Sequence, residues 1–143
     1  MKSRRRVNSA VGRQNIVTRT DEFKSAAATL VSNFRNELGI DLNYDKPSIE
    51  WLDGYINRVA SQLNKDTVPG LATAIGAYLG ETIIATYGGT WHYNERDDQW
   101  GIRFDDGAIA FPFTKVYKQF DDGEFESIYS FFTVLPIIRE HRA

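Results

Sequence analysis

A twenty-residue apolar segment, residues 68–87, sets the strongest limit on how this chain can fold. It reads VPGLATAIGAYLGETIIATY and contains a single charged residue, Glu81. Its length would suit a bilayer span. It also contains three glycines, however, and its flanks lack the clusters of Lys and Arg that anchor a span. A helix that is apolar almost all round is equally typical of the centre of a soluble domain. We therefore predict a core helix here and no membrane span.

Small residues recur at four-residue spacing along this predicted helix. Ala72, Gly76 and Gly80 fall on one of its faces, where they would let a second helix or a sheet approach closely. Glycine destabilises a helix by about 1 kcal/mol relative to alanine, so close packing must compensate. Gly88-Gly89 is predicted to end the helix.

Two further helices are predicted before this one. The first begins at Thr20, a typical helix cap, and ends at Gly39. The second is capped by Asp45 or Ser48. Their apolar residues recur at helical spacing, as Phe23, Ala27, Leu30, Phe34 and Leu38 in the first and Leu52, Ile56, Val59 and Leu63 in the second. The polar residues Glu50, Asp53, Asn57 and Arg58 are predicted to face water.

The hydrophobic period changes from 3.6 to 2 after Gly88-Gly89, which indicates strands. The alternating apolar residues are Trp91 and Tyr93, then Trp100, Ile102 and Phe104, then Ile109 and Phe111. Residues 96–99 form the first loop, and Asp106-Gly107 predicts a two-residue hairpin turn. The sequence therefore predicts a three-stranded antiparallel meander with one buried face.

Loop lengths also predict the register. They set Phe104 opposite Ile109, Ile102 opposite Phe111, Trp91 opposite Phe104, Tyr93 opposite Ile102 and His92 opposite Arg103. In this register one face is aromatic and aliphatic. The other face carries His92, Asn94, Arg103 and Ala110.

Two short helices are predicted after the sheet. One begins after Pro112 and ends at residues 121–123, and the other runs from Phe125 to Pro136. We expect both to pack on the apolar face of the sheet. The predicted fold class is α+β, with three N-terminal helices, the meander and two C-terminal helices in a single domain over residues 20–138.

The charges are unevenly distributed along the 143 residues. Residues 1–20 hold six basic side chains and no acid, which leaves 11 basic against 19 acidic side chains and a net charge of −8 for the rest. We predict that residues 1–19 are a disordered basic arm. The arm alone could contact nucleic acid, because an acidic body is not suited to a phosphate backbone. The sequence shows no secretory signal, which makes the cytoplasm the expected location.

The residue inventory excludes several kinds of site. The chain has no cysteine, which excludes disulfides, thiolate metal sites and cysteine nucleophiles, and it has only two histidines, His92 and His141. No glycine-rich phosphate loop, zinc-protease motif or serine-hydrolase elbow occurs. We predict no metal, no cofactor and no catalytic residue.

Four residues remain as candidates for a binding site or a structural polar cluster: Glu81, Trp91, His92 and Arg103. Glu81 is unusual because burying a carboxylate costs several kcal/mol unless it is paired. It is therefore either a tuned acid or base working with His92 or Arg103, or a structural acceptor of hydrogen bonds, or a residue at the solvent edge of its helix.

Part of the sequence resembles a family of bacterial domains of uncharacterised function. The resemblance covers about residues 40–134, and its most specific part is Gly76-Ala77-Tyr78-Leu79-Gly80-Glu81 followed by Gly88-Gly89-x-Trp91. It also includes Asp45-x-Pro47-Ser48-Ile49-Glu50-Trp51-Leu52-Asp53 before this core and Phe111-Pro112-Phe113-x-Lys115-Val116 after it. It implies a bacterial cytosolic domain and transfers no catalytic residue.

Three functional hypotheses follow from the sequence. The leading one is a non-enzymatic domain that binds another bacterial protein, for example as an inhibitor or immunity-type partner. The alternative is an enzyme or small-ligand binder centred on Glu81, Trp91, His92 and Arg103. The third is a nucleic-acid binder that uses residues 2–19. The sequence leaves the oligomeric state open.

Overall fold

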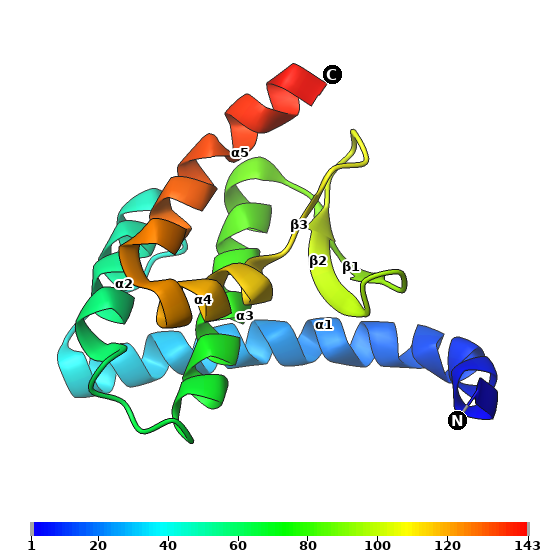
Figure 1. The fold of residues 1–143 in the computed structure, drawn as a ribbon, viewed down its shortest axis with the longest axis horizontal. Helices are drawn as coiled ribbons and strands as arrows, with labels where there is room; N and C mark the ends of the chain where they lie inside the picture. Colours follow the sequence, from blue (N-terminus) through cyan, green and yellow to red (C-terminus); the bar gives the residue numbers. More distant parts are fainter. Residues whose placement is uncertain (1, 143) are drawn as a thin grey trace.

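The computed structural model describes the backbone of residues 2–142 and the side chains of residues 19–138. The elements follow in the order α1 (Lys2–Leu38), α2 (Lys46–Val59), α3 (Val68–Tyr87), β1 (Thr90–Asn94), β2 (Gln99–Arg103), β3 (Ile109–Ala110), α4 (Pro112–Asp122), the 3-10 turn η1 (Gly123–Glu126) and α5 (Ile128–Arg142). Three helices, a three-stranded antiparallel sheet and two helices therefore succeed one another, which confirms the predicted α+β fold (Figure 1).

Helix α1 begins at Lys2 rather than at Thr20. Residues 2–19 contain no proline and one glycine, Gly12, so nothing in them interrupts a helical backbone. The sequence predicts a disordered arm over residues 1–19, whereas the structure has residues 2–19 as the first part of a 37-residue helix, about 55 Å long at 1.5 Å per residue. This part extends past the rest of the domain (Figure 1). The side chains of residues 1–18 lie outside the described residues.

Helix α3 is the core of the domain, as its composition predicts. Nine of its residues are buried, and α1 and α4 pack along it. By length and composition α3 could cross a membrane, yet half of its most apolar stretch is buried inside the domain. It is therefore no clear membrane span, because a core helix meets the same criteria.

The first hairpin has a different register from the predicted one. His92 lies opposite Gly101 rather than Arg103, and Trp91 lies opposite Ile102. The loop covers residues 95–98, one residue earlier than predicted, because side chains close it there. Asn94 Oδ1 accepts the backbone N–H groups of residues 96 (3.1 Å) and 97 (3.4 Å). The Tyr93 hydroxyl donates to the carboxylate of Asp98, whose φ is +52°.

The second hairpin also differs, because its loop has three residues instead of two. The N–H of Phe104 donates to the carbonyl of Ala108 (2.9 Å), and Gly107 takes φ +86° at the end of the loop. Arg103 therefore pairs with Ile109. A shift of one residue exchanges the faces of a strand. Ala110 consequently lies on the apolar face, and Ile109 lies on the polar face with His92 and Arg103.

The apolar face of the sheet is covered by α1, α3 and α4. Phe23 of α1 contacts Trp91 and Trp100, with ring centroids 4.5 and 5.4 Å apart, and Phe113 of α4 stacks on Trp91 at 5.6 Å. Helix α5 packs mainly against α2 instead of the sheet. The expected packing of both C-terminal helices on the sheet is therefore right for α4 and wrong for α5.

Helix α5 continues through Pro136, where the sequence predicted its end. A proline inside a helix leaves the carbonyl four residues earlier without its usual N–H donor. Here that carbonyl belongs to Phe132, and it accepts a hydrogen bond from the Tyr87 hydroxyl at 2.9 Å. A side chain of α3 thus replaces the missing backbone donor, and the helix does not have to end.

Candidate functional site

Glu81 and Trp91 form a direct contact between α3 and β1. The indole Nε1–H of Trp91 donates to Glu81 Oε2 at 2.7 Å, and Glu81 is half-buried. A carboxylate acceptor makes this a charge-assisted hydrogen bond, which is stronger than a bond between neutral groups. The geometry supports the structural role that the sequence offered for Glu81.

The small residues of α3 explain why Trp91 reaches Glu81. A Cβ atom at Gly80 would lie only 2.2 and 2.4 Å from two atoms of the Trp91 ring. A Cβ atom at Gly76 would lie 2.5 Å from the Phe113 ring. The predicted close approach along this face is therefore made by two aromatic rings, one from β1 and one from α4.

A second polar group lies near Glu81. The backbone N–H of Tyr44 donates to the Tyr78 hydroxyl at 2.8 Å, and Tyr44 itself has φ +55°. Burial raises the pKa of the Tyr44 phenol, and the nearby Tyr78 and Glu81 raise it further. Burial also raises the pKa of Tyr78. These phenols stay protonated near neutral pH, so they act as neutral hydrogen-bonding groups beside Glu81.

His92 and Arg103 lie on the other side of the sheet from this contact. Neighbouring residues of a strand point to opposite faces, so His92 points away from the face that holds Trp91. Arg103 is exposed and pairs with Thr90. The structure therefore separates the four predicted residues into Glu81 with Trp91 inside and His92 with Arg103 outside.

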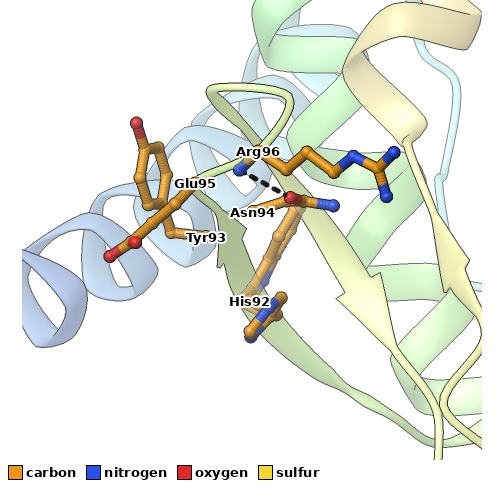
Figure 2. Close-up of a pocket in the computed structure, with 6 residues that line it drawn as sticks. His92, Tyr93, Asn94, Glu95 and Arg96 are labelled. Carbon is orange, nitrogen blue, oxygen red and sulfur yellow. Dashed lines mark hydrogen bonds between the residues drawn. The ribbon is translucent and has the colours of Figure 1, made fainter.

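Two open depressions flank β1. The larger, of about 480 Å³, is lined by residues 91–96. The smaller, of about 340 Å³, is lined by Gly89, Thr90, Arg103, Phe104 and Asp105. Figure 2 shows the first, with Tyr93 and Glu95 extending to one side of the strand and Arg96 to the other. His92 lines the first depression and Arg103 lines the second.

Sequence reasoning missed a polar network between α2, α4 and α5. Gln119 is fully buried, donates from Nε2 to the carbonyl of Asp53 and to Asn57 Oδ1 (both 3.1 Å), and accepts the N–H of Ile128 at 2.7 Å. Asp53 Oδ1 accepts the Ser127 hydroxyl at 2.6 Å. Asp53 and Asn57 were predicted to face water only. The signal was Gln119 itself, a polar residue three positions after Val116 on the apolar stripe.

The network and the Glu81–Trp91 contact both hold elements together. Among the side chains of residues 19–138, no group of three or more His, Cys, Asp or Glu could hold a metal ion. Comparisons with known protein families, characterised proteins and solved structures give no match for this chain.

Proposed function

We propose that this chain is a cytoplasmic bacterial domain that binds another protein and has no catalytic site of its own. The bacterial origin rests on the resemblance of the Gly76–Glu81 and Gly88–Trp91 motifs. The binding function rests on one observation, the exposure of Phe125 in η1. Of its surface, 89% is accessible to solvent. A large aromatic side chain held in water is typical of an interface, because burying it in a partner stabilises the complex.

The turn that carries Phe125 is held by two contacts that directly follow this residue. Lys115 Nζ donates to Glu126 Oε2 at 2.5 Å, and this hydrogen bond holds the pKa of the Glu126 carboxyl below its usual value. Directly afterwards, the backbone N–H of Tyr129 donates to Asp53 Oδ1 at 3.1 Å. Phe125 is therefore presented by an ordered backbone, which reduces the entropy lost on binding.

The charges around Phe125 indicate the kind of partner. Asp121, Asp122 and Glu124 are exposed and lie within four residues of it. A partner surface with an apolar pocket and basic residues at its rim would complement this arrangement. An inhibitor or immunity-type role would use such a surface, and it is one form of the proposed function.

A photocrosslinking experiment tests the proposal. A photoreactive phenylalanine analogue is placed at position 125 in the cells that make the protein, and the matched control carries it at Thr86, an exposed residue of α3. We expect an adduct with one other protein from position 125 and none from position 86. The purified adduct partner should then bind the domain, and Phe125→Ala should weaken that binding by at least about tenfold, as for a hot-spot residue. Identical adducts from both positions would contradict the proposal.

A further inference from the structure

The polar face of the sheet has a regular arrangement of side chains across its three strands. From β1 to β3, one row is Thr90, Arg103 and Ile109, and the next row begins with His92 opposite Gly101. The β2–β3 register, continued by one residue, places Phe111 beyond Gly101. His92 and Arg103 are therefore diagonal neighbours, a pair whose Cα atoms are typically about 7–8 Å apart.

Gly101 lets apolar side chains lie beside these two residues. A Cβ atom at Gly101 would lie 2.7 Å from Ile109 Cγ2 and 3.0 Å from Phe111 Cδ1. The side chains of Ile109 and Phe111 therefore lie over Gly101, with Phe111 in the row of His92 and Ile109 in the row of Arg103. Phe111 and Ile109 are both half-buried, so part of each remains accessible.

The basic groups on this face have no acidic partner. The three ion pairs among the described side chains join Arg19 to Glu22, Arg35 to Asp41 and Lys115 to Glu126. Asp105 lines the same depression as Arg103 without pairing with it. Beyond the first twenty residues the chain has a net charge of −8, and on this face a guanidinium and an imidazole lie beside apolar side chains.

We infer that this outer sheet face binds a free carboxylate attached to an apolar group. The Arg103 guanidinium can donate two parallel hydrogen bonds to a carboxylate. A ring N–H of His92 supplies a further donor from the neighbouring row. The apolar part of the ligand would lie on Ile109 and Phe111. A small apolar acid and the C-terminus of a peptide share this chemistry. The inference does not depend on the interface at Phe125.

A titration followed by amide NMR tests the inference. The probes are N-acetylphenylalanine and, as the uncharged control, N-acetylphenylalaninamide. We expect saturable shifts at residues 90–103 and 109–111 with the acid and none with the amide. Arg103→Gln should weaken binding by about tenfold or more, the loss expected when a hydrogen bond to a charged group is removed. Arg58→Gln is the matched control, because that guanidinium lies over the Trp51 ring of α2, at 5.5 Å.

A second pair of probes separates the two sources of the carboxylate. These are a short peptide that ends in phenylalanine with a free C-terminus and the same peptide with an amidated C-terminus. Tighter binding of the free peptide than of N-acetylphenylalanine assigns the site to chain termini, and equal or weaker binding assigns it to small acids. The inference is overturned if no probe gives saturable shifts, if acid and amide bind alike, or if Arg103→Gln binds as tightly as the parent. Arg103 is exposed, so this variant should fold, and its spectrum checks that it does.

Discussion

Gly80 shows how tightly a single residue can be limited by its surroundings. It lies in the most buried turn of α3, and the Trp91 ring occupies the space that a Cβ atom would need. The sequence suggests that alanine at this position could be neutral, because glycine is a poor helix former. The contact distances of 2.2 and 2.4 Å correct that expectation. Even one methyl group would displace Trp91 and strain its hydrogen bond to Glu81.

We predict that Gly80→Ala lowers the free energy of unfolding by about 1–3 kcal/mol, the usual cost of overpacking a core. The matched control is Gly70→Ala in the same helix, where a Cβ atom would meet nothing within 4 Å. That variant should be neutral or more stable by up to about 1 kcal/mol, because alanine favours the helix. Urea denaturation of the three proteins measures the difference. Equal effects at the two positions would contradict the packing described for Trp91.

The Glu81–Trp91 hydrogen bond gives a second prediction at the scale of a residue. Glu81→Gln keeps an acceptor but removes the charge that strengthens the bond, so we expect a loss of about 1 kcal/mol. In a Trp91→Phe background, which lacks the indole N–H, the same substitution should cost clearly less. Chemical denaturation of the four proteins completes the cycle. A Glu81→Gln variant more stable than the parent would instead indicate a strained active-site carboxylate.

At the scale of elements, the helices were more predictable than the hairpins. Asp45 caps α2 by accepting the N–H of Ser48 at 3.0 Å, and Gly39 follows the end of α1 with φ +66°, both as local sequence signals predict. Such signals depend on neighbouring residues only. The register of a hairpin depends on where its loop closes, and here Asn94 and Asp106 close the loops through hydrogen bonds to backbone N–H groups. Those contacts are formed only in the folded loop.

The same reasoning explains which parts of the candidate site could be predicted. Glu81 is conspicuous as a charge in an apolar helix, and Gly80 is conspicuous as a small residue, so both could be singled out. Their common partner Trp91 is ten residues from Glu81 and on another element. Its position depends on the sheet register. The predicted register of β1 and β2 was wrong by two residues, so it placed His92 directly opposite Arg103. In the structure these two residues are diagonal neighbours.

The passage of α5 through Pro136 gives a prediction at this scale. Tyr87→Phe removes the hydroxyl that donates to the Phe132 carbonyl, so we expect a loss of about 1–3 kcal/mol, the cost of an unsatisfied polar group. In a Pro136→Ala background, the alanine N–H can donate to that carbonyl, and Tyr87→Phe should then cost less. Tyr117→Phe is the control, because that hydroxyl donates to the Pro69 carbonyl at an exposed site. Denaturation midpoints measure all of these, and equal costs in both backgrounds would contradict the role given to Tyr87.

At the scale of the whole molecule, distant segments meet at one buried amide. Gln119 of α4 donates hydrogen bonds to Asp53 and Asn57 of α2, which lie 66 and 62 residues before it in the chain. It also accepts a hydrogen bond from the N–H of Ile128, nine residues after it at the start of α5. These bonds fix α5 on α2 and thereby fix η1, which carries Phe125. The proposed protein interface and the proposed carboxylate site are therefore both formed by residues within the described range 19–138.

The last prediction concerns the basic segment that precedes this range. Residues 2–18 show no hydrophobic periodicity in the sequence, and a helical segment contributes to stability mainly by burying an apolar face. Deleting residues 1–18 should therefore leave the thermal midpoint unchanged within the error of measurement, while α1 from Phe23 onward keeps its contacts with Trp91 and Trp100. A fall of more than about 4 °C, equivalent to about 1 kcal/mol or more for a chain of this length, would show that the segment packs on the domain.

The same deletion tests the nucleic-acid hypothesis. The five basic side chains of residues 1–18 would give binding that weakens steeply with salt and disappears with the segment. We expect the full chain and the shortened chain to show equally little affinity for DNA and RNA, because residues 19–143 have a net charge of −7 and repel a phosphate backbone.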